Sequence, residues 1–150
     1  MRVYWILFFL SLFTVCNVKT ENKGMKINGV SFVASSDSVN QSNVDPVVKL
    51  NSNYVAIMPF GFLSGLDSPT IQYNTNRQWF GETKVGVAQY VKKFQKRGVK
   101  VMLKPHIWIR HGTYTGQLEM KSEENWKRLQ SSYERYIIDY AKLASELDAE

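Results

Sequence analysis

Short apolar runs alternate with amphipathic stretches along most of this chain. Three apolar runs, at residues 26–33, 53–59 and 99–105, are rich in β-branched and aromatic residues and predict three strands. A polar loop rich in Ser, Asn and Asp is predicted over residues 34–44, after the first strand. Pro105 ends the third run and has no backbone N–H, so strand pairing is expected to lapse there.

A helical pattern follows the loop and a second one follows the second strand. Asp45 and Pro46 predict a short helix that ends near Leu50, because the carboxylate caps free N–H groups and proline suits the first helical position. The next helix is predicted over residues 83–97, with Gly98 as its left-handed terminator. Its apolar face is expected to consist of Val85, Ala88, Val91 and Phe94.

A long helix is predicted after residue 121. Ser122 is placed to cap it, and Glu123 and Glu124 in its first turn favour the helix dipole. Apolar and aromatic residues recur every three or four positions and predict the buried face. These are Trp126, Leu129, Tyr133, Tyr136, Ile137, Tyr140, Ala144 and Leu147. The tyrosines are interpreted as packing residues rather than ligand contacts.

The alternation of strand and helix predicts an α/β fold with a parallel sheet, either doubly wound or closed into a barrel. A dinucleotide-binding sheet needs G-x-G-x-x-G directly after its first strand, but residues 34–37 read Ala-Ser-Ser-Asp and contain no glycine. The sequence therefore favours the first three βα units of a (β/α)8 TIM barrel. A fourth strand is expected to begin near Glu150, so we expect a barrel truncated before strand 4.

Two long loops follow the second and third predicted strands, at residues 60–82 and 106–121. Loops of this length inside a compact domain are usually functional, and in a barrel the chemistry lies at the carboxyl ends of the strands. The first loop is unusually aromatic and carries one arginine. Its notable residues are Phe60, Phe62, Tyr73, Arg77, Trp79 and Phe80.

Lys104, His106 and Trp108 stand at the end of the third predicted strand. Strand alternation places Lys104 and His106 on one side of the strand, and Trp108 on the same side if the extended course continues past Pro105. An ammonium and an imidazole can hydrogen-bond sugar hydroxyls, and an indole can pack on the apolar face of a pyranose. These residues therefore predict a sugar site, with a structural histidine beneath the loop as the alternative for His106. Burial of Lys104 without a partner is costly, so an acidic neighbour is expected.

Other kinds of site find little support in the sequence. His106 and His111 are separated by an irregular loop with no Asp or Glu between them, so we expect no metal site and no cofactor. No G-x-S-x-G elbow occurs for a serine nucleophile. The net charge is +6, but six of the nineteen basic residues lie between positions 92 and 104, mostly at a helix end. Nucleic-acid binding is therefore not expected.

The N-terminal residues resemble a secretory signal. Arg2 precedes an apolar run over residues 3–15, which is shorter than the roughly 20 residues of a membrane span. We interpret residues 1–16 as a signal peptide and residues 17–25 as a polar tether, rather than as a buried helix. Cys16 is a candidate for bacterial lipidation, with ordinary cleavage nearby as the alternative. The protein is therefore expected to be secreted or held in the cell envelope as a lipoprotein, with residues 26–150 as its folded domain.

The run at residues 101–108 (Val-Met-Leu-Lys-Pro-His-Ile-Trp), a start reading Gly-Val-Ser-Phe at residues 29–32 and the Trp126-bearing helix together resemble glycoside hydrolase family 113. This resemblance implies a retaining (β/α)8 enzyme, typically a β-mannanase, with an oligo- or polysaccharide substrate. It places the acid/base glutamate at the end of the fourth strand and the nucleophile at the end of the seventh, so no catalytic residue is expected in this chain.

Lys104, His106 and Trp108 are thereby implicated in substrate binding, and Arg77 and Trp79 are added from the aromatic loop. The chain alone is expected to be inactive. Two alternatives stay open at this point: a non-catalytic glycan-binding protein of the same fold, and an envelope-anchored binding module without sugar specificity.

Overall fold

The computed structural model describes residues 26–150, and the expectations for the signal peptide, the tether and Cys16 lie outside this range. Its strands form a parallel sheet in the order β1-β2-β4 and a parallel pair β3-β5. The strands are β1 (Gly29–Phe32), β2 (Tyr54–Ile57), β3 (Phe60–Leu63), β4 (Lys100–Leu103) and β5 (His106–Ile109). The helices are α2 (Gln41–Lys49), α3 (Lys84–Gln95) and α4 (Glu123–Glu146). Short 3₁₀ turns follow at η2 (Phe80–Glu82), η3 (Arg110–Gly112) and η4 (Thr115–Gln117).

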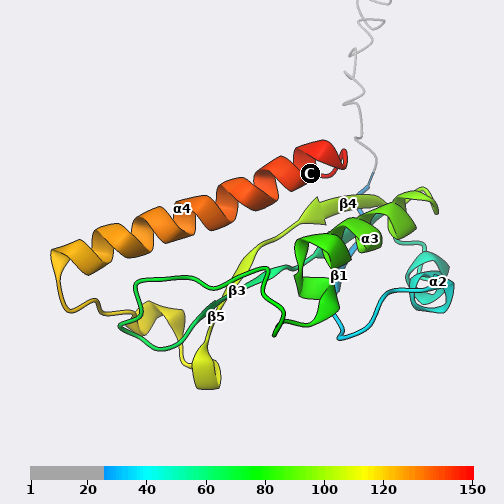
Figure 1. The fold of residues 1–150 in the computed structure, drawn as a ribbon. Helices are drawn as coiled ribbons and strands as arrows, with labels where there is room; N and C mark the ends of the chain where they lie inside the picture. Colours follow the sequence, from blue (N-terminus) through cyan, green and yellow to red (C-terminus); the bar gives the residue numbers. More distant parts are fainter. Residues whose placement is uncertain (1–25) are drawn as a thin grey trace, which may run out of the picture.

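The predicted second and third strands are longer than expected. Each continues after a proline: β3 follows β2 beyond Pro59, and β5 follows β4 beyond Pro105. The Lys104 N–H donates to the Ile57 carbonyl over 2.8 Å, and the His106 N–H donates to the Pro59 carbonyl over 2.9 Å. Pairing is interrupted at Pro105, as predicted, but then resumes. The expectation that residues 60–82 and 106–121 begin as loops is therefore wrong, and Figure 1 shows the two strand pairs running on from one another.

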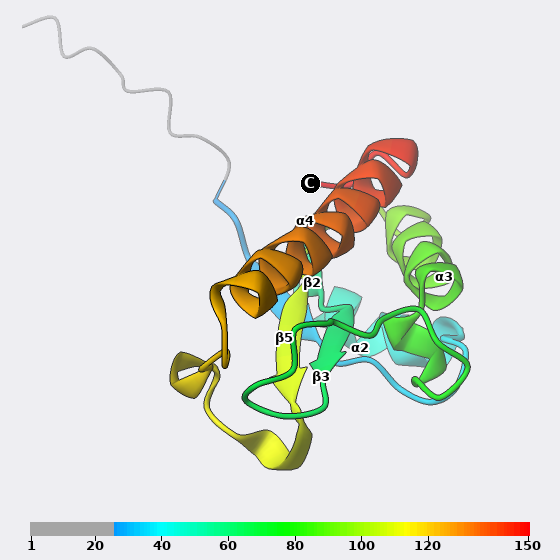
Figure 2. The same ribbon diagram turned by 60° about the vertical axis from the view of Figure 1, so that its left-hand side comes forward.

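One face of the sheet carries the helices and the core. Alternate residues of β2 and β4 are buried there, and Phe32 of β1 packs edge-on against Tyr90 and Phe94 of α3. In Figures 1 and 2, α3 and α4 lie along this side of the strands, with α2 beside α3. The main buried residues are Val55, Ile57, Val87, Tyr90, Val91, Phe94, Val101, Tyr136 and Tyr140. The side chains that alternate with them face away from the helices.

The first helix starts earlier than predicted. Asn40 caps α2 by accepting from the Ser42 N–H over 2.9 Å, and the Asn43 side chain accepts from the Asn40 N–H over 3.0 Å. Pro46 therefore lies inside the helix rather than at its first position. The reciprocal asparagine pair satisfies two free N–H groups, which a cap at Asp45 does not match. Asp45 instead pairs with Arg97, just beyond α3.

The later helices have the predicted ends, but parts of their predicted buried faces are wrong. Thr83 caps α3, Gly98 follows it with φ +71°, and Ser122 caps α4. Val85 is 70% exposed because Gly86, rather than Val85, faces η2 in the first turn, and α3 buries Val87, Tyr90, Val91 and Phe94. On α4, Trp126 and Tyr133 are 42% and 49% exposed, whereas Leu129, Tyr136, Tyr140 and Ala144 are buried as predicted.

Glu150 continues the sheet at the open side of β4. Its N–H donates to the Val101 carbonyl over 2.8 Å, and its carbonyl accepts from the Leu103 N–H over 2.7 Å. This is the hydrogen-bond pattern of parallel neighbours. Within residues 26–150, no helix is both long and apolar enough to cross a membrane.

Candidate functional site

A cavity of about 750 Å³ opens where the strands end and the aromatic loop begins. We call it the aromatic cavity. Its lining comes from the residues after β1, from β3 and β5, and from the loop between β3 and α3. The lining residues are Val33, Ala34, Phe60, Phe62, Gln72, Thr75, Asn76, Arg77, Gln78, Trp79, Glu82 and Trp108. It therefore lies at the carboxyl ends of parallel strands, on the strand face that points away from the helices.

Strand register builds the aromatic side of this cavity. Phe60 of β3 lies beside His106 of β5, and Phe62 lies beside Trp108. The ring of Phe60 makes edge contacts with His106 at 5.5 Å and with Trp108 at 6.4 Å between centroids. Because alternate residues of a strand point to one face, these four rings share the face away from the helices. Trp108 remains 49% exposed, so its ring is available to a ligand.

The loop after β3 folds back onto the strand that precedes it. Gln72 exchanges two backbone hydrogen bonds of 2.8 Å with Phe62. Farther along, the Gln78 side chain donates to the Phe60 carbonyl over 2.9 Å and accepts from the Thr75 N–H over 2.8 Å. The segment that carries Arg77 and Trp79 is therefore held over β3 by a defined set of bonds.

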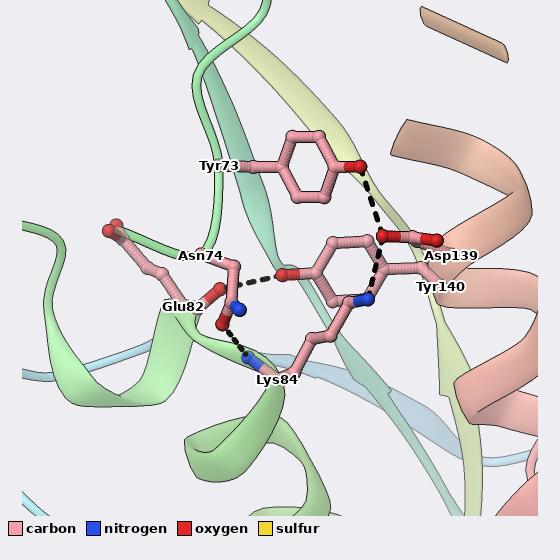
Figure 3. A network of polar contacts seen from close by, with 6 residues as sticks. All are labelled: Tyr73, Asn74, Glu82, Lys84, Asp139 and Tyr140. Atoms are coloured by element: carbon pink, nitrogen blue, oxygen red, sulfur yellow. Dashed lines mark hydrogen bonds and ion pairs between the residues drawn. The ribbon is translucent and has the colours of Figure 1, made fainter. Parts of the chain in front are cut away.

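A polar network ties the same loop to helices α3 and α4 (Figure 3). Asp139 Oδ2 accepts from Lys84 Nζ over 2.6 Å and from the Tyr73 hydroxyl over 3.0 Å. The Lys84 N–H donates to Asn74 Oδ1 over 3.0 Å, so the backbone of Lys84 contacts the loop while its ammonium contacts α4. The hydrogen bond from Lys84 lowers the pKa of Asp139, while burial and then the bond to Asp139 raise the pKa of Tyr73.

The structure brings three of the five predicted site residues to the aromatic cavity. Arg77, Trp79 and Trp108 line it, and Trp79 is 54% exposed. Lys104 and His106 lie on the same strand face as Trp108 but do not line the cavity; His106 packs against Phe60. These placements leave the proposed sugar contacts as predictions.

His106 is half-buried and lies near the positive charge of Lys104. Burial lowers the pKa of His106, and the positive charge of Lys104 lowers it further. The expected acidic neighbour of Lys104 is not among residues 26–150, where no ion pair involves this lysine. Its side chain is exposed, so no buried charge requires a partner within this range.

Glu82, the one acidic residue among the described residues that line the cavity, was not predicted from the sequence. The hydroxyl of Tyr136 was not predicted either; it lies 2.9 Å from the carbonyl oxygens of both Pro59 and His106. The position of Glu82 at the end of an aromatic loop could have indicated that it belongs to the site. Nothing in the sequence predicted the hydrogen bonds of the Tyr136 hydroxyl. Within residues 26–150, no three His, Cys, Asp or Glu side chains gather in a way that could hold a metal ion.

The fold is similar to that of solved β-mannanases. The GH113 β-mannanase AaManA from Alicyclobacillus acidocaldarius, in complex with ManMIm, matches with a TM-score of 0.69 at 21% identity, over 83% of this chain and 42% of that one. A GH113 β-1,4-mannanase gives a TM-score of 0.64 at 19% identity, over 83% and 43% of the two chains. The chain spans less than half the length of these structures. The likeness establishes its fold as the N-terminal βα units of a (β/α)8 barrel.

The sequence itself matches the model of one family. A comparison with curated proteins gave no match. The model of Glycoside Hydrolase Family 113 matches residues 33–150, well over half of the chain. That stretch contains every residue that lines the aromatic cavity. The chain therefore belongs to glycoside hydrolase family 113.

Proposed function

We propose that this chain supplies a glycan-binding wall of an exported glycoside hydrolase that acts on a β-mannan or a related β-linked glycan. The observation that carries the proposal is the aromatic cavity, which a family 113 sequence builds at the carboxyl ends of its barrel strands. Ligand sites of such barrels lie at this end. The similar solved structures are β-mannanases, which supports the substrate class.

The chemistry of the cavity suits a neutral sugar. Trp79 and Trp108 offer flat apolar surfaces for the faces of pyranose rings, and Gln72, Asn76 and Arg77 add exposed hydrogen-bonding groups at its rim. A sugar has an apolar face and an edge of hydroxyls, so aromatic walls with a polar rim match both parts.

Hydrolysis with retention requires two carboxylates about 5 Å apart, one acting as acid and base and the other as nucleophile. Glu150 does not fit either role, since its backbone lies beside Met102, upstream of the strand end that carries His106 and Trp108. We place both catalytic glutamates beyond residue 150, at the ends of later barrel strands. The binding wall alone then positions a glycan without cleaving it.

The activity can be tested on the longest protein that the gene encodes, called the full-length protein below. Reducing-sugar release is measured from β-mannan, with cellulose and xylan as comparison substrates. Turnover of β-mannan that disappears when either downstream strand-end glutamate is replaced by glutamine is expected. Binding of β-mannan without turnover would favour a non-catalytic glycan-binding protein, and absence of both would overturn the proposal.

Removing the indole of Trp108 should weaken glycan binding without unfolding the protein. The loss of ring stacking in Trp108→Ala is expected to cost roughly 0.5–1.5 kcal/mol, up to about tenfold in Kd for a manno-oligosaccharide. Trp126→Ala is the matched control, because Trp126 is similarly exposed, at 42%, but does not line the aromatic cavity. Calorimetric titration measures Kd. Equal losses in both variants, or a lower melting temperature with unchanged Kd for Trp108→Ala, would contradict the assignment.

Export is proposed from the sequence alone, since residues 1–25 lie outside the described range. The basic and apolar start predicts a mature protein that lacks residues 1–15. Mass spectrometry of the envelope and secreted fractions measures this mass directly. A lipid adduct on Cys16 would identify an anchored lipoprotein, whereas an intact Met1 on soluble intracellular protein would contradict export.

A further inference from the structure

Glu82 is a nearly buried carboxylate at the aromatic cavity that the fold does not use as a side-chain partner. The residue is 8% exposed and belongs to η2, directly before the cap of α3. Among residues 26–150 its carboxylate forms no ion pair and accepts no hydrogen bond from another side chain. Every fully buried side-chain nitrogen or oxygen in this range has a hydrogen-bond partner. Each carboxylate oxygen of Glu82 therefore either has a partner or is reachable by solvent.

The backbone of Glu82 is fixed independently of its side chain. Its N–H donates to the Trp79 carbonyl over 3.0 Å, and its own carbonyl accepts from the buried Tyr140 hydroxyl over 3.0 Å. Figure 3 shows the carboxyl group directed away from Tyr140 and from the Lys84 network. The position of Glu82 is therefore fixed by its main chain, and its side chain lines the aromatic cavity.

The position of Glu82 disfavours a charged carboxylate. Burial raises the pKa of Glu82, and the backbone N–H of Trp79 lowers it by a smaller amount, so the fold disfavours the charged form. A buried carboxylate that has no side-chain partner in the free protein, and only the backbone N–H of Trp79 beside it, gains from a ligand that supplies further hydrogen-bond donors. Hydroxyl groups of a sugar are such donors.

We propose that Glu82 is a substrate-specificity residue, whose carboxylate accepts hydrogen bonds from two hydroxyls of a neutral pyranose packed against Trp79. This inference rests on the proposed function, because it takes the aromatic cavity to be a glycan site. Arg77 lines the same cavity, and its positive charge balances that of Glu82. The balance favours an uncharged sugar over a uronic acid or an amino sugar.

The test compares Glu82→Gln with wild type in the full-length protein by calorimetric titration with β-1,4-mannotetraose, cello-oligosaccharides and xylo-oligosaccharides. Hydrogen bonds to a charged group are strong, so Glu82→Gln is expected to weaken binding by about ten- to a hundredfold. Glu134→Gln is the matched control, since Glu134 is an exposed carboxylate on α4 outside the cavity. This control is expected to leave Kd unchanged.

Stability distinguishes ligand binding from a structural role. Because the folded-state pKa of Glu82 is raised, its contribution to stability is present at low pH and is lost as the pH rises through that pKa. A neutral glutamine has no such loss, so Glu82→Gln is expected to melt no lower than wild type at pH 7. A structural carboxylate predicts the opposite result.

The dissociation constant and the melting temperature of Glu82→Gln together decide whether Glu82 binds the glycan. Weaker binding with unchanged or higher melting temperature supports it, and unchanged Kd overturns it while leaving the proposed function intact. If wild type binds a different neutral β-glycan and Glu82→Gln weakens that binding, the role of Glu82 stands and β-mannan as substrate is wrong. A variant that binds less and also melts lower assigns Glu82 to folding and overturns the inference, and a wild type that binds no glycan overturns both proposals.

Discussion

Gly86→Ala is expected to destabilise the protein by roughly 1–3 kcal/mol or more, although alanine normally favours a helix over glycine by about 1 kcal/mol. Gly86 lies in the first turn of α3, and a Cβ there would stand 1.8 Å from the Phe80 carbonyl oxygen and 2.9 Å from the Gly81 Cα. Both contacts are with backbone, so no side-chain rotation relieves them. The η2 turn must move away from α3.

Urea unfolding of the full-length protein measures this loss. The same displacement should also weaken glycan binding, because η2 carries Glu82 and directly follows Trp79. Gly65→Ala is the matched control, since its Cβ would meet only Asp67 Oδ1, at an ordinary 3.6 Å. Stabilisation by Gly86→Ala, as helix propensity alone predicts, would show that η2 does not pack on α3 as described.

Tyr136→Phe is expected to lower the free energy of unfolding by about 2 kcal/mol, because it removes one hydroxyl from two carbonyl oxygens in the protein interior. Those carbonyls belong to Pro59 and His106, at the two interruptions between consecutive strands. The hydroxyl therefore stabilises both strand pairs at the point where proline weakens the ladder. Burial also raises the pKa of Tyr136, so the hydroxyl remains a donor at any ordinary pH.

The control for this variant is Tyr133→Phe on the same helix. Tyr133 is 49% exposed, so loss of its hydroxyl should change stability by less than about 0.5 kcal/mol. Denaturant unfolding of both variants gives the comparison. Similar small effects at the two positions would contradict a structural role for the buried hydroxyl.

The sequence predicted the βα order, because strand and helix periods differ and capping residues mark several helix ends. Thr83, Gly98 and Ser122 were placed correctly on this basis. The strands beyond Pro59 and Pro105 were missed because proline, and glycines such as Gly61 after Pro59, are typical of loops. The start of α2 was misplaced because an Asp-Pro pair is a familiar helix start, whereas the Asn40–Asn43 pair competes for the same role through side-chain bonds.

The candidate site was only partly predictable. Strand alternation correctly placed His106 and Trp108 on one face of the strand. The many aromatic residues of the loop led to the prediction that Trp79 and Arg77 belong to the site. Which of these residues share a cavity depends on how the loop folds back through Gln72 and Gln78, and those bonds have no local sequence signal. Glu82 was missed because a single acidic residue just before a helix is usually interpreted as a favourable charge at its N-terminus.

Binding of a glycan in the aromatic cavity can be observed directly. The most direct measurement is a crystal structure of the full-length protein with a β-1,4-linked manno-oligosaccharide. We expect a pyranose ring packed on Trp79 or Trp108, with hydroxyls within hydrogen-bond distance of the Glu82 carboxylate. Sugar density confined to another surface, with the aromatic cavity filled by the protein's own later residues, would contradict glycan binding in this cavity.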